Sequence, residues 1–175
     1  MLAVVMRLEL SRSVIREWVV GDRESLVRHA NHPGVAANLR DVFPSPYGLA
    51  DADGFLAFVT ARSPQTSFAI EVDGEASGGI GLKLHTDVER MSGELGYWLG
   101  EARWGRGVMT EVVRAFTDWG FATFALHRIY AVPYATNPAS ARVLEKAGFT
   151  YEGRMRRSVI KRGQVLDQLL YADVR

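Results

Sequence analysis

The chain of 175 residues contains no cysteine. Disulfide bonds, cysteine-ligated metal sites and a cysteine nucleophile are therefore excluded, and a reducing compartment fits this composition. No apolar run approaches the roughly 20 residues that a membrane-spanning helix needs. An excess of one charge is also missing, because 21 basic and 20 acidic residues leave a formal net charge of +1. We therefore expect a cytoplasmic protein, with neither a membrane nor a nucleic acid as partner.

The rest of the composition is that of an ordinary globular protein, with 47% hydrophobic and 23% charged residues. A chain of this length is long enough for a full hydrophobic core. We therefore expect residues 1–175 to form a single domain.

The hydrophobic pattern predicts an alternation of strands and helices. Strands are expected at 8–20, 67–72, 76–84, 94–99, 128–132, 151–160 and 165–174. Helices are expected at 22–31, 50–61, 107–124 and 137–147, and residues 33–48 read as a loop. This order predicts an α+β fold, with a mixed sheet that carries helices on its faces.

Three local signals support these boundaries. Asp73-Gly74 lies between two strand patterns and is typical of a tight hairpin turn. Asn137-Pro138 is typical of a helix start, because asparagine caps the first turn and proline fits the first helical position. Gly148 follows the same helix and can adopt the left-handed conformation that ends it.

The most informative segment runs from Gly96 to Thr110, where a strand pattern is followed by a glycine-bracketed loop and a helix start. Gly105 and Gly107 lack a Cβ, so their backbone can approach a ligand closely. A helix N-terminus presents free N–H groups and the positive end of the helix dipole. The segment therefore indicates a site for a phosphate or pyrophosphate, although a tight turn made for packing has the same pattern.

This segment resembles the pyrophosphate loop of the GNAT superfamily of acyl-CoA N-acyltransferases, which has the form [Q/R]-x-x-G-x-[G/A]. Here it reads Trp104-Gly105-Arg106-Gly107-Val108-Met109. Gly107 is retained, Trp104 replaces Gln or Arg, and Met109 replaces the small last residue. Further residues resemble the branch of ribosomal-protein alanine N-acetyltransferases, namely Ile15-Arg16, Phe43-Pro44, Tyr97-Trp98, Asn137, Ser140 and Gly148-Phe149.

The resemblance implies a single-domain GNAT fold with a mostly antiparallel sheet of about seven strands, about four helices, and splayed strands 4 and 5. It implies acetyl-CoA as co-substrate, an amine acceptor and no metal; a homodimer is left open. The implied acetyl-CoA site comprises Tyr97, Trp98, Leu99, Trp104, Gly105, Arg106, Gly107, Val108, Met109, Thr110, Asn137 and Ser140. The side chains of residues 97–99 are themselves expected in the core.

The resemblance also assigns the leaving-group chemistry. Ser140 corresponds to a hydroxyl that stabilises the departing CoA thiolate, and otherwise reads as an exposed serine in the first turn of a helix. Many GNAT enzymes place a tyrosine seven residues after the asparagine that corresponds to Asn137. Leu144 occupies that position here and cannot donate a proton. Three alternatives remain: Ser140 stabilises the thiolate without a tyrosine, another group donates the proton, or the chain is a weak catalyst.

Acyl transfer to an amine needs a group that removes a proton from the amine. Glu94 is the expected base, because related polyamine acetyltransferases carry a functional carboxylate at this spacing from the loop. A cross-strand ion pair or an anchor for substrate charge explains Glu94 nearly as well. His85 is a second candidate base, and Asp167 is a candidate anchor for the acceptor amine.

The predicted function is transfer of an acetyl group from acetyl-CoA to a protein N-terminus or a small amine, directly within a ternary complex. One alternative is a polyamine or amine-drug acetyltransferase, which an acidic lining around Glu94, Asp41 and Asp51 would favour. The other is a non-catalytic acyl-CoA-binding module.

A cluster of basic residues near the end of the chain stands apart from these motifs. It is expected to be an exposed, charge-protected hairpin; the alternative is contact with the nucleotide end of CoA or with an acidic or RNA-bound partner. The cluster comprises Arg154, Arg156, Arg157, Lys161 and Arg162.

Overall fold

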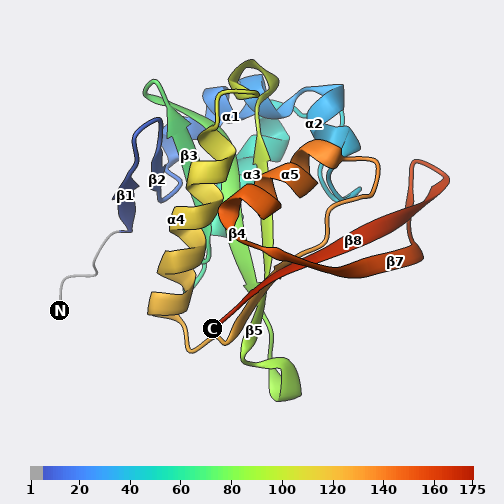
Figure 1. The fold of residues 1–175 in the computed structure, drawn as a ribbon. Coiled ribbons are helices and arrows are strands. Elements are labelled where there is room, and N and C mark those ends of the chain that lie inside the picture. Colours follow the sequence, from blue (N-terminus) through green and yellow to red (C-terminus); the bar gives the residue numbers. More distant parts are fainter. Residues whose placement is uncertain (1–5) are drawn as a thin grey trace.

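The computed structural model describes residues 6–175, which form one eight-stranded sheet flanked by helices (Figure 1). The sheet order is β1-β2-β3-β4-β5-β6-β8-β7, and every pair is antiparallel except β5 with β6. The strands are β1 (Arg7–Glu9), β2 (Val14–Arg16), β3 (Ser67–Val72), β4 (Glu75–Leu84), β5 (Ser92–Leu99), β6 (Arg128–Ala131), β7 (Thr150–Lys161) and β8 (Gln164–Val174). The expected α+β GNAT architecture is confirmed.

Five α-helices cover the sheet. They are α1 (Arg23–Ala30), α2 (Pro33–Ala37), α3 (Leu49–Thr60), α4 (Val108–Thr123) and α5 (Pro138–Ala147). Short 3-10 turns lie at η1 (Val20–Asp22), η2 (Asp87–Glu89) and η3 (Glu101–Arg103). The helix starts follow the sequence: Asn137 caps α5 by accepting a hydrogen bond from the Ser140 N–H, and Gly148 ends it with φ 102°.

Two sequence predictions are wrong in the N-terminal third. The single strand expected at 8–20 is two short strands, because a turn at 10–13, closed by the Leu10 N–H on the Ser13 carbonyl, folds β2 back on β1. The loop expected at 33–48 contains α2, since Pro33 occupies its first turn and the His32 side chain accepts the Gly34 N–H. These two differences raise the strand count from seven to eight and the helix count from four to five.

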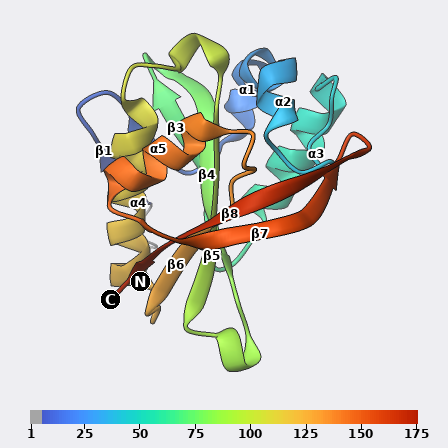
Figure 2. The same cartoon turned by 45° about the vertical axis from the view of Figure 1, so that its right-hand side comes forward.

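The sheet separates two hydrophobic cores (Figure 2). On one face, α4 and α5 bury Val112, Phe116 and Leu144 against the strands. On the other face, α1 and α3 bury Leu26 and Leu56. Because side chains of a strand alternate between faces, β5 contributes to both cores, and its backbone lies at the centre of the fold.

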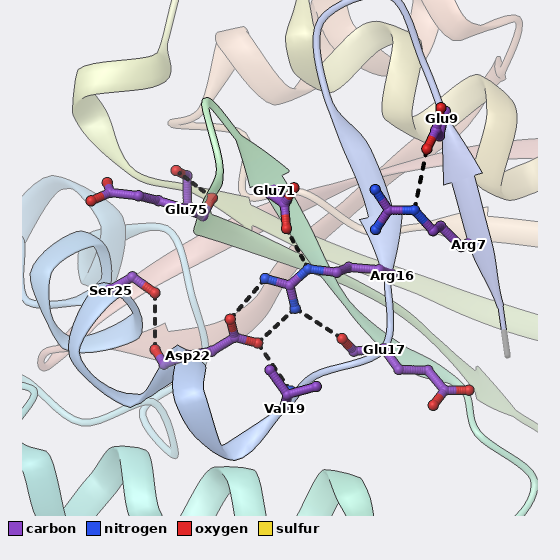
Figure 3. Close-up of polar contacts among 10 residues, drawn as sticks. Arg7, Glu9, Arg16, Glu17, Val19, Asp22, Ser25, Glu71 and Glu75 are labelled. Atoms are coloured by element: carbon purple, nitrogen blue, oxygen red, sulfur yellow. Dashed lines mark hydrogen bonds and ion pairs between the residues drawn. The ribbon is translucent and has the colours of Figure 1, made fainter.

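A half-buried ionic network joins β2 to β3 and to η1, the turn just before α1 (Figure 3). The Arg16 guanidinium donates to both Asp22 carboxylate oxygens at 2.8 Å and to Glu71 on β3 at 2.5 Å. The hydrogen bond to Asp22 contributes most to raising the pKa of Arg16 above its usual value. Asp22 does lie at the expected helix start, but its carboxylate accepts from the Val19 N–H and Arg16 rather than capping α1.

Candidate active site

The candidate site is a cleft where two neighbouring strands diverge. β5 and β6 pair in parallel only at residues 92–94 with 128–130, although β5 continues to Leu99. A cleft of about 750 Å³ opens beyond this point, between the diverging strands and the N-terminal ends of α4 and α5. The expected splay of the strands at 94–99 and 128–132 is therefore present.

Glu94 and every residue of the expected acetyl-CoA site line this one cleft. They are Glu94, Tyr97, Trp98, Leu99, Trp104, Gly105, Arg106, Gly107, Val108, Met109, Thr110, Asn137 and Ser140. The sequence therefore identified one contiguous surface, although these residues come from a strand, a loop and two helices.

The cleft side of β5 carries main-chain groups that no strand covers. The Gly100 N–H donates to the Ser77 carbonyl on β4, and the N–H of His85, the residue just after β4, donates to the Ser92 carbonyl. In antiparallel pairing, alternate residues of a strand bond to the same neighbour, so the even-numbered residues of β5 from 92 to 100 face β4. The main-chain groups of residues 95, 97 and 99 therefore point away from β4, toward the side that β6 has left. An extended ligand carrying amide groups can pair with such an open edge.

The loop before α4 adopts a conformation that favours glycine. Gly105 and Gly107 have φ values of 73° and 76°, and Gly107 is the N-cap of α4. Trp104, which replaces the Gln or Arg of the family pattern, donates its indole N–H to the Leu99 carbonyl at 2.7 Å. Trp104 therefore fixes the loop against the open end of β5, and the adjacent helix N-terminus faces the cleft.

Basic side chains surround the loop end of the cleft. Arg103, Arg106, Arg142 and Lys146 all line it. Arg103 is held by an ion pair with Asp73, whereas Arg142 and Lys146 are four residues apart and so lie on one face of α5. This end of the cleft is therefore suited to an anionic ligand.

The start of α5 meets β5 across the cleft. The Tyr97 hydroxyl lies 2.7 Å from Ser140 Oγ, and Asn137 Oδ1 accepts the Ser140 N–H at 3.2 Å. Burial raises the pKa of Tyr97, so its phenol stays protonated across the ordinary pH range. Leu144 is fully buried in the core.

The side chains of residues 97–99 were expected in the core, and this holds only in part. Tyr97 packs against the α4 side of the sheet and Trp98 against the α1 side, as alternation requires. The phenol of Tyr97 nevertheless ends in the cleft, where its hydroxyl contacts Ser140. A tyrosine is long enough to bury its ring and still present its polar tip.

The opposite end of the cleft is built from separate segments. Glu94 on β5 accepts a hydrogen bond from Arg40 at 2.6 Å. The Glu94 side chain is 16% exposed and that of Arg40 is 67% exposed, so the arginine covers the carboxylate from the solvent side. Tyr130 and Tyr134 also line this end, and Tyr134 donates to the Leu39 carbonyl.

The β7–β8 hairpin forms one wall of this end and projects from the body of the sheet (Figure 1). Met155, Val159 and Gln168 from the hairpin line the cleft. Lys161 near the hairpin turn pairs with Asp41 at 2.6 Å. The hairpin is therefore fastened to the segment between α2 and α3.

The basic cluster on this hairpin is only partly the exposed surface that the sequence predicted. The Lys161 side chain is 7% exposed, because it turns inward to Asp41. Arg154 pairs with Asp167 at 3.5 Å. Arg154, Arg156, Arg157 and Arg162 are exposed, as expected.

The two secondary candidates lie outside the cleft lining. His85 contacts the Tyr130 hydroxyl at 2.9 Å, so it reaches the cleft only through that tyrosine. Asp167 accepts the Arg157 N–H and pairs with Arg154, so its carboxylate is occupied within the hairpin. The structure therefore brings Glu94, and neither His85 nor Asp167, to the cleft.

Several cleft residues were missed at the sequence level. The spacing of Arg142 and Lys146 on the Asn137 helix contained the signal for a shared face, since residues four apart are neighbours on a helix. Arg40 and Tyr134 offered no such signal, because their positions depend on how distant segments pack. Among residues 6–175 there is no cluster of three or more metal-ligating side chains. Within the same range no helix is both long and apolar enough to cross a membrane.

Comparison with known proteins agrees with this geometry. A family model described as "Acetyltransferase (GNAT) domain" matches residues 12–150. The chain is 49% identical over 65 residues to the probable N-acetyltransferase YjcK of Bacillus subtilis (strain 168), covering 37% of this chain and 36% of that protein. It is 27% identical over 97 residues to a spermidine N(1)-acetyltransferase of Escherichia coli (strain K12), covering 55% and 52%. The chain thus spans about a third to a half of the length of these curated relatives.

A solved structure extends the similarity across the chain. The structure of RimL, a ribosomal L7/L12 alpha-N-protein acetyltransferase in complex with coenzyme A, superimposes with a TM-score of 0.84 at 18% identity. The match covers 97% of this chain and 98% of the other. At this identity the likeness establishes the fold.

Proposed function

The chain belongs to the GNAT acetyltransferase family, and on that basis we propose that it transfers an acetyl group from acetyl-CoA to a primary amine. One observation carries the proposal. The open edge of β5, the glycine loop before α4 and the start of α5 all line a single cleft. An extended amide chain with a phosphate group at one end needs these features together.

The donor end of the cleft fits acetyl-CoA. The N–H groups at the start of α4 and the positive-φ glycines provide a cradle for a pyrophosphate. Arg106, Arg142 and Lys146 provide positive charge for the nucleotide phosphates. The free main-chain groups of residues 95 and 97 are placed to pair with the amides of the pantetheine arm.

The acceptor end favours an amine with one positive charge over a polyamine. A polyamine site needs several free carboxylates, yet those expected there already have partners. Glu94 pairs with Arg40, Asp41 pairs with Lys161, and Asp51 accepts the Gly48 N–H. We therefore propose a protein N-terminus or a small monoamine as acceptor, in line with the substrate named for RimL rather than that named for the spermidine enzyme.

The proposed chemistry is direct transfer. The neutral amine attacks the thioester carbonyl, and the carbon–sulfur bond breaks to leave acetyl on nitrogen and the electron pair on sulfur. Glu94 takes the proton from the amine, directly or through water, once Arg40 yields part of its contact. The enzyme contributes chiefly by holding the amine against the thioester.

Turnover of an amine panel tests the proposal. The purified protein is mixed with acetyl-CoA and, separately, N-terminal peptides, monoamines, spermidine and an aminoglycoside, and released CoA is measured with a thiol reagent. Because the chain has no cysteine, the protein itself gives no background. Turnover confined to peptides or monoamines is expected. Acetyl-CoA binding without turnover of any amine would instead identify a non-catalytic acyl-CoA-binding module.

A further inference from the structure

The contact between Tyr97 and Ser140 joins two elements that share no strand or helix pairing. Tyr97 lies on β5 and Ser140 in the first turn of α5, 43 residues later, and their hydroxyl oxygens are 2.7 Å apart. The Tyr97 oxygen has a second, longer contact of 3.4 Å, to the Ser140 carbonyl. Both residues line the cleft beside the open edge of β5. The pair is thus placed where the thioester would enter.

The direction of this hydrogen bond decides what Ser140 can do. Each hydroxyl has one proton and can accept through its lone pairs. A phenol is a stronger acid than an aliphatic hydroxyl, so the favoured arrangement has Tyr97 donating to Ser140 Oγ. The Ser140 proton is then not used by Tyr97. The Ser140 N–H is held by Asn137 Oδ1 at 3.2 Å, so the position of the serine is fixed from a second side.

We propose that Tyr97 is a positioning residue for the leaving group: by donating to Ser140 Oγ, it leaves the serine proton free to point at the sulfur of CoA. The proposal rests on the proposed function and adds a residue to it. When the carbon–sulfur bond breaks, the electron pair stays on sulfur and Ser140 donates a hydrogen bond to the thiolate. Tyr97 keeps its proton, in agreement with its burial.

This arrangement gives a physical role to a tyrosine that does not lie on α5. Leu144 occupies the helix position where many family members carry a tyrosine, and it is fully buried. Here the phenol reaches the start of α5 from β5 instead. Unlike a tyrosine that protonates sulfur itself, Tyr97 acts through Ser140, so its effect must vanish when Ser140 is removed.

The test measures the ionisation of the thiol of bound CoA. The ultraviolet absorbance of the thiolate is followed against pH for CoA bound to the wild type, Ser140→Ala, Tyr97→Phe and the double variant. The absence of cysteine from the chain leaves CoA as the only thiol. Ser140→Ala should move the midpoint to higher pH by about one pH unit, the size expected for a lost hydrogen bond to an anion. Tyr97→Phe should move it in the same direction by less.

The double variant separates positioning from an independent effect. Its midpoint should equal that of Ser140→Ala, because Tyr97 acts only through the serine. An unmoved midpoint in Tyr97→Phe or in Ser140→Ala would overturn the proposal, and so would additive shifts in the double variant. In turnover, Tyr97→Phe should lower kcat by roughly threefold to fivefold, less than Ser140→Ala does, and leave KM for acetyl-CoA unchanged.

Tyr171→Phe is the matched control. Tyr171 is another buried tyrosine whose hydroxyl contacts α5, at Glu145 Oε1 2.9 Å away, and it does not line the cleft. Removal of the Tyr171 hydroxyl should leave the titration midpoint of the CoA thiol unchanged, whatever it does to the stability of the protein. Since CoA binding needs no acceptor, an absence of turnover would reject the proposed function while the midpoints still decide the role of Tyr97.

Discussion

The two ends of the cleft differ in what they are built from. At the proposed donor end, main-chain groups of the contiguous residues 104–110 and of the open edge of β5 form the core of the site, and a few basic side chains add charge. At the acceptor end they are side chains from distant segments, such as Arg40, Glu94, Tyr134 and Met155. Main-chain groups keep their chemistry under substitution, whereas side chains define a particular substrate. The donor end can therefore serve a whole family, while the acceptor end identifies this protein.

The largest expected effect concerns the acceptor end. Glu94→Gln keeps the size of the side chain but removes the proposed base, so kcat should fall by about 100-fold or more. The pH–rate profile should change as well, and the dissociation constant for acetyl-CoA should not. An unchanged profile would mean that Glu94 only anchors charge. Asp87→Asn, an exposed carboxylate in the β4–β5 connection, serves as the control.

At the donor end, a change of backbone conformation should weaken acetyl-CoA binding. Gly107→Val forces a β-branched residue to φ 76°, although open space would receive its Cβ, so the cost is conformational rather than steric. Acetyl-CoA should bind about tenfold or more weakly in calorimetry, because the cradle must change shape. Gly74→Val is matched, since Gly74 has φ 80°, equally open surroundings and a place in the β3–β4 turn. Equal weakening by both variants would mean that general destabilisation is responsible.

The attachment of the hairpin should affect only the acceptor. Asp41→Asn removes the partner of Lys161, whose side chain is buried. The hairpin wall should become less firmly held, and the KM for the acceptor should rise by roughly threefold to tenfold. This rise corresponds to a loss of about 1 kcal/mol in the free energy of acceptor binding. The acetyl-CoA dissociation constant should stay the same. If acetyl-CoA binding weakens instead, the two ends of the cleft are not separable.

The smallest effect is expected from the charges on α5. Replacing Arg142 and Lys146 by glutamine should weaken the binding of CoA by about threefold at low salt. The effect should be smaller at high salt, because exposed charges are screened. Arg90→Gln, at an exposed arginine outside this cleft, is the control. A salt-independent loss would indicate a specific contact rather than a general attraction for phosphate.

Some features followed directly from the sequence because they depend on neighbouring residues. The Asp73-Gly74 turn, the Asn137 cap of α5 and the left-handed Gly148 that ends this helix each result from a few consecutive residues. The N-terminal third was harder, since β1, β2 and α2 are only three to five residues long. Elements of that length contain too few repeats of the hydrophobic pattern to be recognised in the sequence.

The sequence by itself determined the fold class and the succession of strand, glycine loop and helix before and at α4, because local conformation and hydrophobic periodicity carry that information. Only the tertiary structure decided that Arg40 covers Glu94, that Lys161 turns inward to Asp41, and that Tyr97 meets Ser140. These pairs are 54, 120 and 43 residues apart, and such contacts depend on the packing of the whole sheet and its helices. The acceptor end is made of contacts of this kind, so its chemistry became visible only in the folded chain.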